Sequence, residues 1–129
     1  NELNLDGYSY INLIVLLYIF IGGGLGSLAR YGVGQINFLQ NKLPLGTLTA
    51  NILACIILGI TLYFIKDKID GSIFIKYFLV IGFCGGFSTF STFSLETVQL
   101  FNDGMLSYAL ANVFLSITVA VCILWVLTK

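Results

Sequence analysis

The sequence predicts an all-α membrane protein with four transmembrane helices, and three observations carry that prediction. Of the 129 residues, 58% are hydrophobic and 9% are charged, and the mean hydropathy is +0.99, which is far from the composition of a soluble domain. The charges leave four uncharged runs, at residues 7–29, 43–65, 77–95 and 104–128. Because a helix needs roughly 20 residues to cross the hydrocarbon core, each run is long enough for one span. The connections between the runs are short, as expected for antiparallel neighbours.

We expect the spans at about 10–34, 45–65, 74–97 and 105–127, in a single domain that covers residues 1–129. A cleaved signal peptide is the alternative for the first run, but residues 1–10 contain no Lys or Arg to form its basic region. Pro44 stands where the start of a helix tolerates proline. The connections are then "NFLQNKLPLG", "KDKIDGS" and "FNDG".

The third span contains the stretch "GFCGGFSTFSTF" between Gly82 and Phe93. Three glycines weaken its hydrogen-bond ladder, so we expect the helix to break there, in mid-membrane. Unwound backbone at that depth is tolerated where it is buried in protein or lines a cavity, and its free carbonyls can coordinate a cation. The sequence therefore predicts a broken helix at a functional position.

Several functional classes are excluded by composition. Six basic and six acidic residues cancel, so no basic face is available to bind nucleic acid. The chain has no histidine, and Cys55, Cys84 and Cys122 lie in three different apolar segments. This pattern indicates small buried side chains, not a zinc site. No nucleophile with a partner base is present, so we expect no enzyme activity.

Polar residues inside the spans each allow a packing role and a functional one. Asn51 could bond a neighbouring helix or face a wet pathway. Arg30 could snorkel to the interface or hold a positive potential at a vestibule, and the glycines before it favour a close helix-packing seam. Glu96 could cap the end of its helix or stand in a polar file with Thr89 and Thr92.

Two further patterns remain open at this point. Phe90 and Phe93 lie near one face after the break, where packing is the simpler explanation. Tyr108, Asn112 and Ser116 recur at intervals of four and predict one polar stripe on the fourth helix.

The charge distribution and the size of the chain bear on its assembly. Lys66, Lys68, Lys76 and Lys129 would lie on one side and Arg30 and Lys42 on the other, which favours a cytoplasmic N-terminus mildly and leaves both orientations open. Four helices enclose little space, so a solute path would need a second copy of the chain to complete its wall.

The motifs "GGGLGSLARY", "GTLTANILACIILG" and "GFCGGFSTFSTFSLE", in this order, resemble the Fluc (CrcB) family of small fluoride channels. The third motif is the most specific, and the resemblance covers essentially the whole chain. It implies an antiparallel homodimer with dual topology in the bacterial plasma or inner membrane. It also implies two pores per dimer that export fluoride passively and so relieve fluoride toxicity. The expected partners are fluoride, a second copy of the chain and membrane lipid.

The resemblance also implies roles for individual residues. A structural sodium ion at the dimer centre would be held by the backbone carbonyls of Gly85 and Ser88, the latter standing where the family usually has Thr. The vestibule would carry Arg30, and Glu96 would end the polar track. The expected pore-lining residues are Asn51, Phe90, Ser91, Thr92, Phe93, Tyr108 and Ser116.

These residue types suit a small and strongly hydrated anion. Amide and hydroxyl groups donate hydrogen bonds without adding negative charge, and phenyl rings are positive at their edges. Two other functions remain as alternatives. A small four-helix multidrug exporter would need a deep carboxylate, usually in the first helix, and a noncatalytic membrane assembly subunit would conduct no ions.

Overall fold

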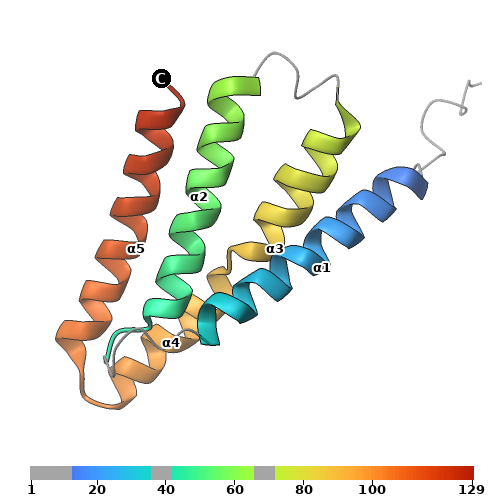
Figure 1. The fold of residues 1–129 in the computed structure, drawn as a ribbon. Helices are drawn as coiled ribbons and strands as arrows, with labels where there is room; N and C mark the ends of the chain where they lie inside the picture. Colours follow the sequence, from blue (N-terminus) through green and yellow to red (C-terminus); the bar gives the residue numbers. More distant parts are fainter. Residues whose placement is uncertain (1–12, 36–41, 66–71) are drawn as a thin grey trace, which may run out of the picture.

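A computed structural model describes residues 13–35, 42–65 and 72–129, and these residues form helices and no strand. Figure 1 shows the arrangement, in which α2 and α5 stand side by side and α1 slants away from them. The predicted all-α class is confirmed. The helices, in chain order, are α1 (Leu13–Gln35), α2 (Leu45–Ile65), η3 (Phe74–Cys84), α3 (Gly85–Phe87), α4 (Phe90–Asn102) and α5 (Leu106–Leu127).

Four helical stretches in the described part of the chain are long and apolar enough to cross a membrane: Leu13–Gln35, Leu45–Ile65, Phe74–Asn102 and Leu106–Leu127. The third extends five residues beyond the predicted 97. Residues 10–12 of the first predicted span, residues 37–41 of the first connection, and residues 66–71 with Lys66 and Lys68 lie outside the described residues.

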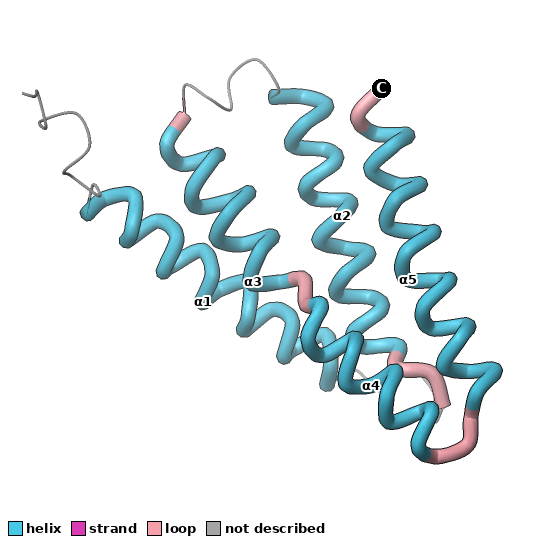
Figure 2. Tube along the Cα trace, turned by 180° about the vertical axis from the view of Figure 1, so that it is seen from behind, coloured by secondary structure: helices cyan, strands magenta, loops and turns pink. Residues whose placement is uncertain are grey.

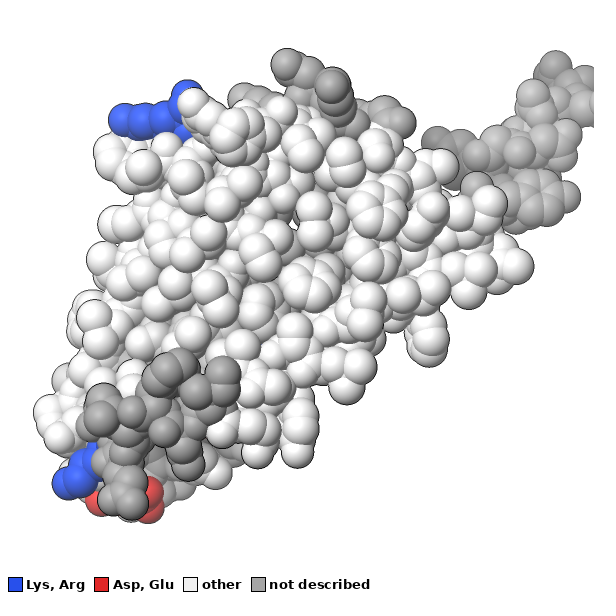
Figure 3. Space-filling model, viewed as in Figure 1, with Lys and Arg blue, Asp and Glu red and all other residues white. Residues whose placement is uncertain are grey.

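The outer surface of the spans is apolar. Phe20 is 79% exposed and Phe64 is 74% exposed, and large aliphatic side chains are exposed along every span. In Figure 3 the visible face is uncharged over most of its length, and its coloured charges lie at the two ends. A protein surrounded by lipid has this distribution, because apolar side chains there need not be buried.

Glycines bring α1 against the third span at backbone distance. A Cβ atom at Gly26 would lie 2.8 Å from the Phe87 nitrogen, and one at Gly86 would lie 3.0 Å from the Gly23 carbonyl carbon. Gly22 faces the Phe78 carbonyl in the same way, whereas Gly24 has nothing within 4 Å. The predicted packing seam is therefore present, and Gly24 is not part of it.

The third connection is a Schellman turn between α4 and α5. Gly104 has a positive φ of 72°, which suits glycine because it has no Cβ. The Met105 N–H donates to the Leu100 carbonyl at 2.9 Å, and the Gly104 N–H donates to the Phe101 carbonyl at 3.0 Å. At the start of α2, the Pro44 carbonyl accepts the Leu48 N–H at 3.1 Å, so Pro44 immediately precedes the helix as expected.

The third span is broken as predicted, but not at its glycines. Gly82 lies within the π-helical η3, and Gly85 and Gly86 lie in the helical turn α3. The backbone leaves the helical conformation at Ser88 (φ −79°, ψ 157°) and Thr89 (φ −150°, ψ 124°). Gly82 and Gly86 lie against the backbone of α1, whereas a Cβ at Gly85 would meet nothing within 4 Å. Hydrogen bonds described below hold the extended residues.

Candidate functional site

The break separates two helix ends that point at the same short segment. Figure 2 shows it as the loop between α3 and α4. The C-terminus of α3 presents carbonyl groups and partial negative charge, and the N-terminus of α4 presents N–H groups and partial positive charge. One end therefore favours a cation and the other an anion.

Asn51 on α2 holds the break through a paired hydrogen bond to one peptide group. The Thr89 N–H donates to Asn51 Oδ1 at 2.7 Å, and Asn51 Nδ2 donates to the Thr89 carbonyl at 3.1 Å. Asn51 lies one turn after the N-terminal residues of α2, on the side facing the break. Asn51 therefore bonds the neighbouring span, which is the first of its two expected roles, and it also lines the groove described below.

Thr89 is the N-cap of α4 and begins a file of hydroxyl groups. Its Oγ1 accepts the Thr92 N–H at 3.1 Å, a cap typically worth about 0.5–2 kcal/mol. It also donates to Thr92 Oγ1 at 3.1 Å, and Ser91 Oγ lies 3.3 Å from it. Thr89 is buried and Ser91 is exposed, so the file has one end inside the chain and one at its surface.

The carbonyls of Gly85 and Ser88 were predicted to hold sodium, and the donor set at the break fits a cation. In a continuous helix, the N–H groups four residues on, those of Thr89 and Thr92, would bond these two carbonyls. Here both N–H groups donate to side chains instead. Carbonyl oxygens at an unwound segment and at the C-terminal end of a half-helix are the ligands that suit Na⁺.

A groove of about 350 Å³ opens beside the break and contains several predicted pore residues. Asn51, Phe90, Phe93 and Ser116 line it, and the Ser116 Oγ is buried without a hydrogen-bond partner in the described part of the chain. Cys55 also lines the groove. The lining comes from α2, the break, α4 and α5, and its full set is Asn51, Cys55, Ser88, Thr89, Phe90, Phe93, Ser116, Ile117, Ala120 and Val121.

A second hollow, of about 320 Å³, lies where the C-terminal part of α1 meets α2 and α4. Arg30, Thr47, Thr92 and Glu96 line it. Thr47 Oγ1 donates to Glu96 Oε1 at 2.7 Å, and Glu96 Oε2 is buried without a described hydrogen-bond partner. Because α4 continues to Asn102, Glu96 does not cap the end of its helix. Its described hydrogen bond goes to Thr47, and Thr92 lines the same hollow.

The three residues of the predicted polar stripe on α5 lie in three different environments. Tyr108 is exposed and its ring lies under the Lys42 ammonium at 5.6 Å. Asn112 is 2% exposed, and its Nδ2 donates to Thr97 Oγ1 at 2.9 Å, which bonds α5 to α4. Of the three, only Ser116 lines the groove. Residues at intervals of four stay near one face of a helix, so the different partners of the three side chains come from how α5 docks against its neighbours.

The cysteines are free, as expected, but they are not uniformly buried. Cys84 is buried, Cys55 is partly exposed in the groove, and Cys122 is exposed. In the part of the chain that the structure describes, no cluster of His, Cys, Asp and Glu could hold a metal ion.

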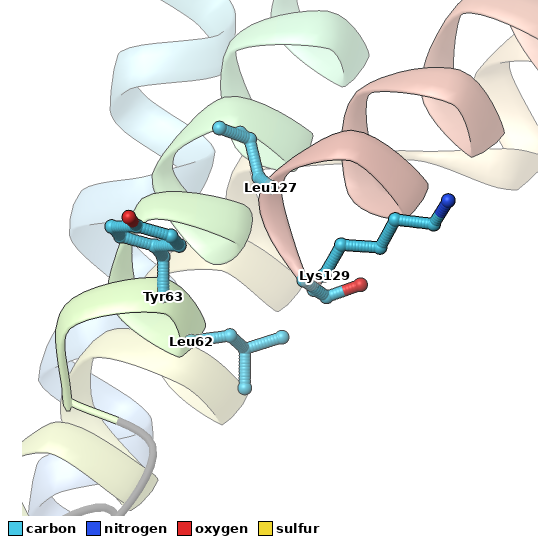
Figure 4. Close-up of a pocket in the computed structure, with 5 residues that line it drawn as sticks. Leu62, Tyr63, Leu127 and Lys129 are labelled. Atoms are coloured by element: carbon cyan, nitrogen blue, oxygen red, sulfur yellow. The ribbon is translucent and has the colours of Figure 1, made fainter.

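A further hollow, of about 250 Å³, lies at the far ends of α2 and α5 and contains no predicted site residue. Figure 4 shows Leu62 and Tyr63 on one side, with the Lys129 side chain extending away from them. The Lys129 ammonium lies 3.9 Å from the centroid of the Trp125 ring. Aromatic and basic residues at a helix end are typical of the interface between hydrocarbon and headgroups.

Thr47 and Thr97 were not predicted as site or network residues. Thr47 lies one turn before Asn51, so its i, i+4 relation to a polar residue was the available signal. Nothing in the sequence pairs Thr97 with Asn112, because that contact depends on how α4 and α5 dock.

Fold and site together define a small multi-pass membrane protein with a broken span and a polar file beside it. The family described as "CrcB-like protein, Camphor Resistance (CrcB)" matches residues 17–127, and the chain belongs to this family. It is therefore a multi-pass protein of the bacterial plasma membrane.

Curated relatives carry a common name, "Fluoride-specific ion channel FluC". The protein from Enterobacter sp. (strain 638) is 44% identical over 102 residues, covering 78% of this chain and 80% of its own length. The Coxiella burnetii (strain CbuK_Q154) protein is 40% identical over 113 residues, covering 85% and 91%. The Escherichia coli (strain K12) protein is 43% identical over 106 residues, covering 81% and 84%. These relatives are named as channels and not as enzymes.

Proposed function

We propose that this protein is a fluoride-selective ion channel that lets fluoride leave the cell passively and so relieves its toxicity. The single observation that carries the proposal is the hydroxyl file from Thr89 to Thr92, which runs from the groove at the break to the hollow lined by Arg30. The name shared by the relatives supports fluoride as the ion.

The chemistry of the lining supports conduction of a small anion. Fluoride must exchange its water for hydrogen-bond donors, and the lining offers the Ser116 hydroxyl, the second N–H of the Asn51 amide and the Thr92 hydroxyl. The Ser91 hydroxyl lies beside this lining, 3.3 Å from Thr89 Oγ1. The N-terminus of α4 adds partial positive charge at the same place. Arg30 would raise the local concentration of anions at the mouth. Several moderate contacts let the ion leave again, and no lysine is among the described residues that line either hollow.

We further propose that the working unit is an antiparallel homodimer with two pores, surrounded by lipid. The groove lies open on the surface of one chain, and Phe90 is 80% exposed at its edge. A second copy would close the groove and cover that ring, so the ring edges of Phe90 and Phe93 would face the anion. A structural sodium ion at the dimer centre, bound by the Gly85 and Ser88 carbonyls, would offset the partial negative charge of the α3 C-terminus.

Purified protein in liposomes tests the function. Liposomes loaded with potassium fluoride should release fluoride when valinomycin carries the counter-ion, and liposomes loaded with chloride should retain it. Lack of fluoride release from folded protein would refute the channel and favour the assembly-subunit alternative. A multidrug exporter is not favoured, because the carboxylates in the described residues are Glu96 and Asp103, neither of which lies on α1.

A further inference from the structure

We propose that the Thr89 hydroxyl and the Asn51 amide are positioning groups that keep the Ser88 and Gly85 carbonyls open for a cation at the break. The inference rests on the proposed function, since it concerns the sodium site of the channel. It assigns to two side chains a task that is separate from contact with the permeating anion.

The argument begins with the two amide groups that could close the site. Were the helix to continue through the break, the Thr89 N–H would bond the Gly85 carbonyl and the Thr92 N–H would bond the Ser88 carbonyl. Asn51 Oδ1 takes the first N–H at 2.7 Å, and Thr89 Oγ1 takes the second at 3.1 Å. Each side chain thus removes the competitor of one carbonyl.

The bonds also fix the backbone around those carbonyls. Asn51 Nδ2 donates to the Thr89 carbonyl at 3.1 Å, so both polar atoms of that residue's backbone are held by one amide. On the other side of the break, the Cys84 carbonyl accepts both the Ser88 N–H at 3.0 Å and the Ser88 Oγ at 2.9 Å. The segment between these two anchors is short and extended at Ser88 and Thr89.

The exposure of the residues at the break supports a cation that a second chain would also bind. Gly85 is exposed and Ser88 is partly exposed, whereas Phe87 between them is buried. The two residues whose carbonyls would bind the cation are therefore the ones that the surface of one chain presents. A positive charge there would also complement the C-terminal end of α3.

The test is the sodium dependence of unfolding, which does not rely on conduction. Protein is purified without sodium, and its unfolding temperature is followed as sodium chloride replaces N-methylglucamine chloride at constant ionic strength. The wild type should be stabilised by sodium, since a ligand of the folded state raises stability with its concentration. Thr89→Val should raise the sodium concentration at half-effect by on the order of tenfold or more, as does the loss of groups that orient the ligands of other metal sites. Thr89→Ser keeps the hydroxyl oxygen, so its sodium concentration at half-effect should equal that of the wild type.

A matched control separates this role from the general loss of a buried hydroxyl. Thr61 Oγ1 donates to the Ile57 carbonyl at 2.7 Å in α2, and no backbone N–H is diverted there. Thr61→Val should leave the sodium midpoint at the wild-type value. A wild-type midpoint in folded Thr89→Val, or a wild type that sodium does not stabilise, would overturn the inference.

The Asn51 variants give an independent answer if Thr89→Val does not fold. Asn51→Asp keeps an acceptor for the Thr89 N–H but loses the Nδ2 donor, so its sodium midpoint should lie below that of Asn51→Leu. Asn51→Leu has no acceptor, and its midpoint should rise. Equal midpoints in the two variants would overturn the inference. Fluoride release from the same wild-type preparation is scored separately, so sodium stabilisation without fluoride release would refute the channel and leave the positioning roles standing.

Discussion

The rings of Phe90 and Phe93 lie with centroids 5.8 Å apart and planes inclined at 42°, yet one side chain is 80% exposed and the other 9%. Phe93 packs inside its own chain, while Phe90 projects from it. Within a dimer, one ring would be held by the subunit that carries it and the other by contact with the partner.

Replacement of either ring should reduce fluoride flux with different effects on stability. Phe90→Ile and Phe93→Ile each remove a ring edge, a contact of about 0.5–1.5 kcal/mol, so flux in liposomes should fall roughly two- to tenfold. Phe93→Ile should also destabilise the protein by up to about 1.5 kcal/mol, because that ring is buried. Phe114→Ile on the exposed face of α5 is the control and should change neither quantity. Normal flux in both pore variants would remove the ring-edge role.

Asn51→Asp should abolish fluoride release. The substitution places a carboxylate beside the groove and replaces the Nδ2 donor to the Thr89 carbonyl by a repelling oxygen. Electrogenic efflux measures the effect, and gel filtration in detergent shows whether the assembled species is unchanged. Wild-type efflux in this variant would leave Asn51 with a purely structural role.

The glycine seam predicts opposite outcomes for two neighbouring glycines of α1. Gly26→Ala places a Cβ 2.8 Å from the Phe87 nitrogen, so it should destabilise the protein by about 1–3 kcal/mol through overpacking. Gly24→Ala meets nothing within 4 Å and should be neutral or stabilising by up to about 1 kcal/mol, because alanine favours the helix. Thermal unfolding in detergent ranks the two, and equal stabilities would contradict the seam.

Asn112 should matter for stability and not for conduction. Asn112→Leu removes the amide that bonds Thr97 Oγ1 at 2.9 Å, which should cost about 0.6–2 kcal/mol. A double-mutant cycle with Thr97→Val isolates this contact and should give a coupling energy of similar size. Fluoride release from Asn112→Leu should match that of the wild type. A loss of flux from protein that is still folded would indicate that Asn112 lines the fluoride pathway.

Much of the architecture follows from local pattern. The uncharged runs predicted the four spans because burying a charge in hydrocarbon is costly, and the glycines of "GFCGGFSTFSTF" predicted a broken span. The residue at which the helix breaks could not be predicted from these features. It depends on Asn51, which is 38 positions away from Thr89 in the chain and reaches it through the docking of α2.

The site was predictable residue by residue only where neighbours share a helix. Thr89, Thr92 and Glu96 follow intervals of three and four, and the structure keeps the hydroxyl pair in contact. The α5 residues follow a regular interval as well, but Asn112 turns toward Thr97 and Tyr108 toward Lys42. The docking of the helices determines which neighbour a polar side chain bonds, and the interval between residues in the sequence does not predict that docking.

The contact between α1 and the third span has a practical consequence. Backbone atoms at the glycines and the Tyr18 ring make that contact, whereas the outward side chains of Leu25 and Leu28 are 47% and 67% exposed. A cysteine at Leu28, in a background without the native thiols, would carry a fluorescent or spin label on a rigid helix without disturbing the fold. The distance between two such labels would then measure how two copies of the chain are oriented in a membrane.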